Sequence, residues 1–140
     1  MKSIKEILEY VLKTTKIFKK HGFAGNELNS IFNNEIPLVF FNELKLSDKY
    51  VVKASCGKGS FAKIPWICIL DKEITKLIQE GYYIAILFTE DMSGFYITLN
   101  QGFAWFSDNF GETRGKKIAN SLSLYLKDEI NAPLDRKIDL

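Results

Sequence analysis

The part of this chain whose residue types could do chemistry is the loop that runs from Ser55 to Trp66. Gly57 and Gly59 flank Lys58 there, and the tryptophan opens a strongly apolar stretch. Two glycines let the backbone adopt positive φ angles and approach a partner closely. The loop therefore offers backbone N–H groups, one mobile ammonium and a large flat aromatic surface. This combination suits a polyanion with aromatic faces, which indicates nucleic acid.

The rest of the sequence contains few residues that would form a hydrolytic active site or a metal site. There is a single histidine, His21, and the two cysteines, Cys56 and Cys68, lack the spacing of metal ligands. The glycine loop is no Walker A motif, because the first glycine of G-x-x-x-x-G-K-[ST], five positions before Gly57, is missing. We therefore expect no catalytic residue, no bound metal and no cofactor. The cysteine usage also favours a reducing, cytoplasmic setting.

One short sequence pattern resembles the metal site of a metal-dependent nuclease. Glu43-Leu44-Lys45 has the E-x-K form in which a carboxylate holds Mg²⁺ and the lysine assists. Such a pattern is frequent by chance, and no aspartate stands before it on an obvious strand. We expect Glu43 and Lys45 to lie in a solvated turn, and we keep a magnesium-dependent nuclease domain as an alternative function.

Length and composition indicate one globular domain that covers residues 1–140. The chain is 46% apolar and 26% charged, and its length suffices for a core without disulfides. No stretch approaches the ~18 apolar residues of a membrane span, and no signal peptide is visible. The net charge of +2 is too small to indicate a nucleic-acid partner by itself. Basic residues cluster in two places, where solvated helix faces explain them as well as phosphate contacts do. These residues are Lys2, Lys5, Lys13, Lys16, Lys19 and Lys20, and then Arg114, Lys116 and Lys117.

The periodicity of apolar residues predicts an α+β fold. The order is helix, then strands, then helix, with a hairpin in the strand-rich centre. We expect a single domain in which a mixed, largely antiparallel sheet is packed by N- and C-terminal helices. Pro37 starts an apolar segment of ambiguous type, and a second aromatic cluster around Trp105 receives no assignment. The expected helices or helical turns cover residues 3–20, 26–34, 73–79 and 113–130, and the expected strands cover 50–54, 65–70, 82–89 and 95–99.

The strand expected at 82–89 places three residues on one face of the sheet. Alternation along it puts Tyr83, Ala85 and Leu87 on the same side. Because alanine is small, we expect a recess there between an aromatic and an aliphatic wall. Packing of a terminal helix over this face explains the same pattern, and the residues alone favour that explanation. The many aromatic residues also leave a protein-interaction module with an aromatic interface as an alternative function.

Two blocks of residues resemble a known family. The first has the form Val-x-Ala-Ser-x-Gly-x-Gly-x-Phe-x-x-Ile-Pro-Trp and runs from Val52 to Trp66. The second is Gly81-Tyr82-Tyr83, with Leu87 four residues on. Together with Leu99-Asn100-Gln101-Gly102, they are similar to the N-terminal DNA-binding domain of McrB, the recognition subunit of the McrBC methylation-dependent restriction system. The similarity covers about residues 50–102.

The resemblance implies that the domain binds duplex DNA in which a purine precedes a modified cytosine, and that it rotates the modified base out of the helix into a pocket. The walls of that pocket would be Trp66, Tyr83 and Leu87. The glycine loop would approach the DNA at the position that the base has left. In the best-known member an aromatic residue at the position of Lys58 wedges into the duplex, so a lysine would instead contact a phosphate or a groove acceptor. The loop residues expected to touch DNA are Ser55, Gly57, Lys58, Gly59, Ser60 and Lys63.

The resemblance therefore implies a recognition domain without catalytic activity, part of a modification-dependent restriction or antiviral defence system. Its expected partner is double-stranded DNA with modified (methylated) cytosine. A GTPase or ATPase motor domain and a nuclease subunit would lie outside these 140 residues. No membrane partner is expected, and the expected location is the cytoplasm.

Overall fold

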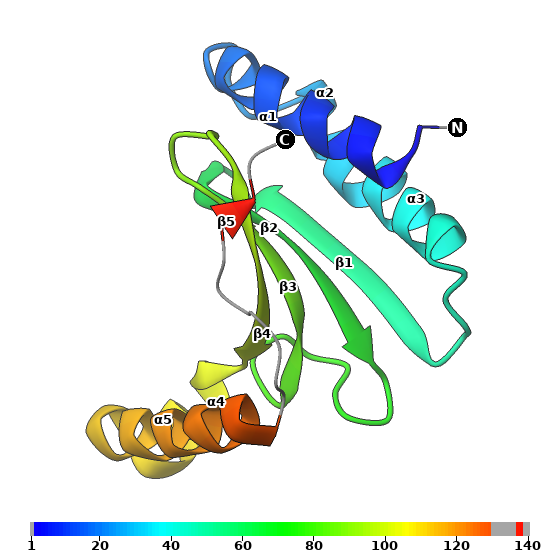
Figure 1. Ribbon diagram of the computed structural model, residues 1–140. Helices are drawn as coiled ribbons and strands as arrows, with labels where there is room; N and C mark the ends of the chain where they lie inside the picture. Colours follow the sequence, from blue (N-terminus) through cyan, green and yellow to red (C-terminus); the bar gives the residue numbers. More distant parts are fainter. Residues whose placement is uncertain (1, 130–136, 139–140) are drawn as a thin grey trace.

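The computed structural model describes residues 2–129 and 137–138 (Figure 1). The described helical elements are α1 (Ile4–Lys19), α2 (Glu27–Ser30), the π-helical segment η1 (Ile31–Glu35), α3 (Ile36–Glu43), α4 (Phe103–Phe110) and α5 (Glu112–Glu129). The strands are β1 (Tyr50–Gly57), β2 (Phe61–Asp71), β3 (Tyr82–Phe88), β4 (Phe95–Gln101) and β5 (Lys137–Ile138). This arrangement confirms the expected α+β class.

Helix α1 begins at a capping box. The Ser3 hydroxyl accepts the N–H of Glu6, and the Glu6 carboxylate accepts the N–H of Ser3, so two free donors of the first turn are satisfied. A third donor, the N–H of Ile4, binds Glu43 Oε2 at 2.6 Å. Gly22, with a φ of 81°, follows the end of the helix. The expected N-terminal helix is confirmed.

Elements α2, η1 and α3 follow one another without a break, where we expected a short helix and then an ambiguous segment from Pro37. Proline inside an α-helix has no N–H to donate, and its ring collides with the carbonyl four residues earlier. The wider π turn relieves this conflict, because the N–H of Ile36 bonds to the carbonyl of Ile31, five residues back. Val39 and Phe40 of α3 thereby reach the core.

The sheet is an antiparallel meander in the order β1-β2-β3-β4-β5. Strands β1 and β2 pair from Tyr50 with Asp71 to Gly57 with Phe61, and the register shifts between Ser55 and Gly57. Strands β3 and β4 pair along their whole length, which confirms the expected hairpin. The outer edge of β1 pairs with no other described strand.

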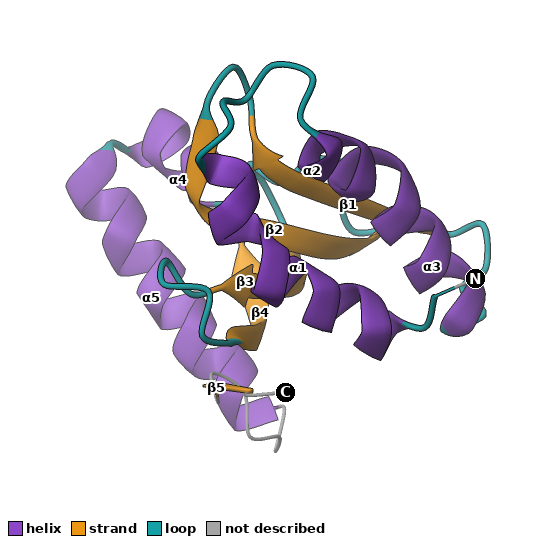
Figure 2. Cartoon of the chain, turned by 90° about the horizontal axis from the view of Figure 1, so that it is seen from above, coloured by secondary structure: helices purple, strands orange, loops and turns teal. Residues whose placement is uncertain are grey.

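The N-terminal helices lie over β1 and β2 on one face of the sheet (Figure 2). The core between the two layers includes Phe32 and Phe40 from the helices and Ile67 and Phe88 from the sheet, all almost fully buried. The rings of Phe32 and Phe88 meet edge to face, with their centroids 6.1 Å apart. Because burial of such a side chain stabilises a fold by about 1.5–3 kcal/mol, these contacts hold the helical layer on the sheet.

The segment 72–81 contains turns, so the helical turns expected at 73–79 were wrong. The hydroxyl of Thr75 accepts the N–H of Leu77 at 3.1 Å and donates to its carbonyl at 2.9 Å. Such local hydrogen bonds of a threonine compete with the helical pattern of the backbone. The segment instead runs across the end of the sheet and packs on the start of α4.

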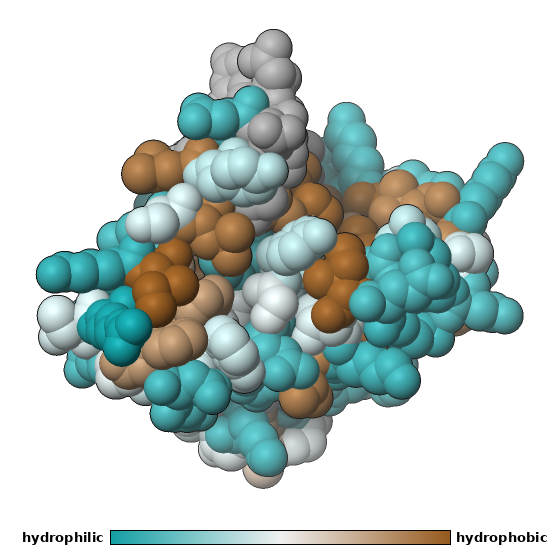
Figure 3. Space-filling view, turned by 90° about the horizontal axis from the view of Figure 1, so that it is seen from below, coloured by the Kyte–Doolittle hydropathy of each residue, from teal (hydrophilic) through white to brown (hydrophobic). Residues whose placement is uncertain are grey.

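Helices α4 and α5 pack on each other beyond the end of β4 (Figure 1). The aromatic cluster at 103–110 is therefore helical, and the expected C-terminal helix is confirmed over its described residues. Seen from below, apolar side chains form separate patches rather than one continuous surface (Figure 3). Leu124 and Tyr125 of α5 are among the exposed apolar residues. None of the described helices is long and apolar enough to cross a membrane.

Gly102 allows the segment 72–81 to approach the end of β4, because a Cβ there would collide with the main chain of Gln79 and Glu80. We expect Gly102→Ala to push this segment away and to lower the free energy of unfolding by about 1–3 kcal/mol. Urea unfolding followed by circular dichroism measures the loss. Ala104→Ser, which adds one atom to an exposed position of α4, is the control and should change stability little. Equal midpoints for the two variants would contradict this account.

Candidate nucleic-acid interface

The face of the sheet opposite the helices carries the pocket residues predicted from the sequence. Trp66 on β2 lies directly opposite Leu87 on β3, and both side chains are partly buried. Alternation along β3 adds Ala85 and Tyr83 to the same face. On its other side Trp66 pairs with Ser55, just before the glycine loop. The register therefore brings Trp66 and Leu87 together beside that loop.

Tyr83 lies further from the loop and is held in place. Its side chain is 7% exposed. Its hydroxyl donates to the carbonyl of Ile78 at 2.8 Å and accepts from Asn100 Nδ2 at 3.2 Å. Burial raises the pKa of this hydroxyl above its ordinary value. The Tyr83 ring is thus a rigid part of the sheet face, fixed by the segment 72–81 on one side and by β4 on the other.

The surface over Ala85, where we expected a recess, is closed to solvent in this structure. Ala85 has no exposed surface and packs in a cluster with Cys68, Leu70 and Tyr83. The small side chain of alanine is therefore used for tight packing in this structure, which corrects that expectation. The more accessible part of the face lies toward the glycine loop, around Trp66.

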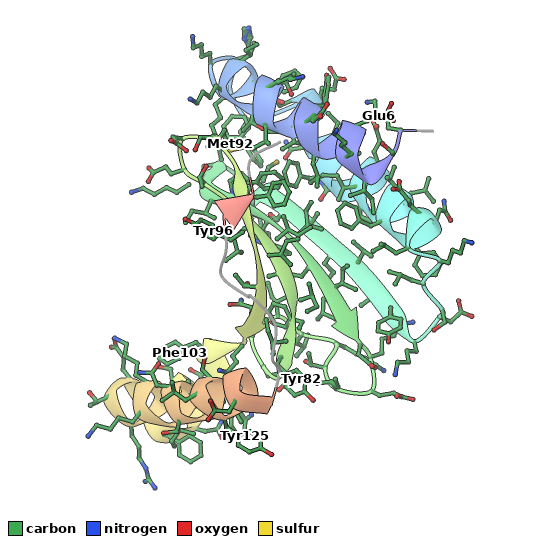
Figure 4. All side chains as sticks on the ribbon, in the orientation of Figure 1. Glu6, Tyr82, Met92, Tyr96, Phe103 and Tyr125 are labelled. Carbon is green, nitrogen blue, oxygen red and sulfur yellow. The ribbon has the colours of Figure 1, made fainter. Side chains whose placement is uncertain are left out.

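Strand β4 contributes residues to this face that the sequence reasoning missed. Tyr96 lies opposite Leu87, and Thr98 lies opposite Ala85. Figure 4 shows Tyr96 beside β5, at the end of the sheet near the end of α1. The hydroxyl of Thr98 is buried and has no hydrogen-bond partner in the part of the chain that the structure describes. Alternation along the expected strand at 95–99, read against its hairpin partner, is the signal that could have found these residues.

The glycine loop has a backbone that only glycine allows. Gly57 has a φ of 130° and Gly59 a φ of 74°, and a Cβ at Gly57 would collide with the carbonyl of Ser60. The hydroxyl of Ser55 accepts the N–H of Gly57 at 3.1 Å, which closes the turn. Lys58, Gly59 and Ser60 are exposed at its tip. The loop can therefore present both backbone and ammonium to a partner.

The base of the loop is anchored to the helical layer. The ring of Phe61 meets that of Phe23 edge to face, with centroids 5.0 Å apart. Lys19 Nζ donates to the carbonyl of Ala62 at 3.1 Å. Alternation places Lys63, which is exposed, on the helix side of β2, away from the face that carries the pocket residues. Of the predicted DNA-contacting residues, Lys63 is thus the one that the fold separates from the others.

The described residues show no arrangement typical of catalysis. Burial raises the pKa of Cys68 to about 12 and also raises that of Cys56, whereas an activated cysteine has a lowered pKa. Glu43 is used to cap α1 through Ile4, and Lys45 is exposed with a φ of 52°. No group of three or more His, Cys, Asp or Glu in the described part of the chain is placed to hold a metal ion. The structure thus gives no support to the nuclease alternative.

Comparison with known protein families finds a match. The family described as MrcB-like, N-terminal domain, matches residues 9–140. No curated protein matches the chain significantly. The family match spans nearly the whole chain, agrees with the resemblance of the glycine-loop and tyrosine blocks, and carries a DNA-binding role in a restriction context. The chain therefore belongs to the family of McrB-like N-terminal domains.

Proposed function

We propose that this chain recognises modified cytosine in duplex DNA by turning the modified base out of the helix, as the reading domain of a modification-dependent restriction system. The observation that carries the proposal is the pairing of Trp66 with Leu87 on one side and with Ser55 on the other. It sets an aromatic ring and an aliphatic wall beside a glycine loop whose exposed tip carries Lys58. A flipped nucleotide needs both kinds of surface, one for its base and one for its phosphate.

The pocket residues have different roles in this proposal. Trp66 offers its ring for stacking, and Leu87 offers an apolar contact for the modifying group. Tyr83, held by the carbonyl of Ile78, forms the wall furthest from the loop. The loop tip approaches the gap in the duplex. The domain itself breaks no bond, and the motor and nuclease activities belong to other domains or subunits.

The energetics limit what such a pocket contributes. Extruding a base costs a few kcal/mol, and stacking it on an aromatic ring returns about 1–3 kcal/mol. Burial of one methyl group adds only about 0.8 kcal/mol, which corresponds to about fourfold in affinity. A stronger preference for methylated cytosine therefore requires a shape that an unmodified base leaves unfilled. Most of the affinity comes from phosphate contacts and weakens with salt.

Replacing Trp66 with alanine should remove the stacking surface and weaken binding of a modified duplex by about 1–3 kcal/mol. Leu87→Ala should reduce the ratio of affinities between modified and unmodified duplexes. Ile84→Ala is the matched control, because Ile84 lies on the same strand, faces the other side of the sheet and is 38% exposed. Fluorescence anisotropy with duplexes that contain cytosine, 5-methylcytosine or 5-hydroxymethylcytosine, at low and moderate salt, measures these effects.

Undetectable binding of the wild-type chain to all three duplexes would refute the proposed function itself. If the wild-type chain prefers the modified duplex and Trp66→Ala and Leu87→Ala keep the same preference, only the assignment of the pocket would be refuted. If both variants lose all binding while Ile84→Ala does not, and all three keep the wild-type melting temperature, the pocket supplies affinity as well as specificity.

Thr98→Val removes a buried hydroxyl that lacks a described partner and keeps the shape of the side chain. Thr98 lies opposite Ala85, which has no exposed surface, and its buried hydroxyl is out of reach of a base at Trp66 and Leu87, so we expect it to affect stability rather than binding. The variant should stabilise the free protein by about 1 kcal/mol and leave binding of the modified duplex unchanged. Thermal melting and anisotropy measure the two effects separately. Thr89→Val is the contrasting control, because Thr89 Oγ1 accepts the N–H of Ser93 at 3.0 Å and its loss should destabilise the protein.

Lys58 is expected to contact the DNA by charge rather than by insertion. Lys58→Ala should weaken binding to modified and unmodified duplexes alike. The slope of log affinity against log salt should become shallower by the amount expected for about one phosphate contact. Lys58→Tyr should recover affinity for the modified duplex through stacking, by about 1–3 kcal/mol relative to alanine. Binding measured at several salt concentrations distinguishes the two effects. An unchanged salt dependence in Lys58→Ala would exclude a phosphate contact at the loop tip.

A further inference from the structure

The two halves of α1 differ in how their charges are balanced. In the first half, Lys5 lies 3.8 Å from Glu9, and the preceding Lys2 lies 3.4 Å from Glu35 of η1. The second half carries lysines and no acidic residue. Its exposed lysines, together with Lys20 at the C-cap, have no ion-pair partner among the described residues. These are Lys13, Lys16 and Lys20.

These three lysines lie on one side of the helix. At 3.6 residues per turn their directions fall within about 60° of one another, away from the buried positions Val11 and Thr15. Attraction to the negative end of the helix dipole accounts for basic residues only in the last turn. Lys13 lies before that turn, so the dipole does not account for the whole row, which we call the lysine face of α1.

The lysine face ends beside the glycine loop. The hydrogen bond from Lys19 to the carbonyl of Ala62 and the contact of Phe23 with Phe61 join the end of α1 to the start of β2. Figure 1 shows this helix end and the end of β1 at the same end of the molecule. Phosphates on the strand that the loop contacts would therefore pass within reach of the helix.

The surroundings of the lysine face remain positive when the nearby acidic residues are included. Within residues 2–129 and 137–138, the acidic residues near this end are Glu27 at the start of α2 and Glu90 and Asp91 in the β3–β4 turn. The lysines of α1 together with Lys58 and Lys63 outnumber them. A surplus of positive charge on one end, in a chain whose total net charge is only +2, matches a polyanionic partner.

The spacing also fits a nucleic-acid strand. Lys20 stands seven positions after Lys13, which is about 10 Å along the helix axis. Phosphates of one strand follow at about 3.4 Å along the duplex axis, so about three of them span this distance. Each lysine has a long flexible side chain that adapts to such a row.

We propose that the lysine face of α1, made of Lys13, Lys16 and Lys20, binds the phosphate backbone of duplex DNA next to the flipped base. This inference rests on the proposed function and adds a second surface to it. The sheet face recognises the base, whereas the helical layer supplies affinity that does not depend on base or modification. Lys19 acts as the tether between the two, through its bond to the carbonyl of Ala62.

The test compares a triple variant, Lys13→Gln, Lys16→Gln and Lys20→Gln, with a control of equal charge at the opposite end of the sheet. The control is Lys45→Gln, Lys72→Gln and Lys76→Gln, three exposed positions. Anisotropy titrations use 5-methylcytosine and unmodified duplexes between 50 and 200 mM salt, and circular dichroism with thermal melting checks the fold. In the lysine-face variant, the slope of log affinity against log salt should be shallower than in the wild type by about 2.7. The ratio of the wild-type affinity to the variant affinity should accordingly fall about 40-fold between 50 and 200 mM salt.

The affinity ratio between the two duplexes should stay that of the wild type in the lysine-face variant, and the control should keep the wild-type slope. A wild-type slope in the lysine-face variant, with DNA binding by the wild-type chain intact, would overturn this inference and leave the proposed function standing. Equal losses in both triple variants would also overturn it, because only total charge would then matter. Absence of DNA binding by the wild-type chain would overturn the proposed function and this inference together.

Discussion

The register of β2 is the constraint on which the proposed interface depends. Trp66 and Ile67 are neighbours in sequence and lie on opposite faces of the sheet, and Ile67 is completely buried beneath the helices. A slip of one residue would exchange the two faces and place the indole in the helix-side core. Packing of Ile67 therefore decides on which side Trp66 emerges, and with it the pairing to Ser55 and Leu87. The interface is thus set by a core that never touches the ligand.

The glycine loop joins a fixed base to a free tip. At its base, Phe61 packs on Phe23, and the thiol of Cys56 donates to Asn29 Oδ1 at 3.1 Å. Only the tip around Lys58 extends into solvent. Because few residues remain to be ordered on binding, little conformational entropy is lost at this site. Anchoring by the helical layer therefore fixes the base of the loop in advance of the proposed contact with DNA.

Local rules predicted those features that depend on neighbours in sequence. Alternation placed Tyr83 and Leu87 on one face, and the hairpin and the terminal helices followed from periodicity and turn residues. Contacts between distant segments decided the rest. Ala85 is closed to solvent because it packs in a cluster with Cys68 and Leu70 of β2 and with Tyr83, and the position of Thr98 opposite Ala85 appears only when β4 is paired with β3. The π turn and the turns of 72–81 likewise depend on competing hydrogen bonds that a periodicity of apolar residues does not encode.

If the domain reads a modified base as proposed, separate surfaces for the base and for the backbone would follow from the small free-energy difference that one methyl group provides. One methyl group is worth about fourfold in affinity, so discrimination depends on a close apolar fit, which hydrated charges at the pocket would impair. Phosphate contacts raise the affinity for every duplex equally and need no such fit. In the proposed complex, lysines on α1, in the layer opposite Trp66 and Leu87, would supply that affinity without entering the pocket. In the proposed complex these phosphate contacts lie beside the glycine loop. Lys58 at the tip then binds the DNA backbone by charge instead of inserting into the duplex, and this attraction replaces the stacking that an aromatic wedge would add.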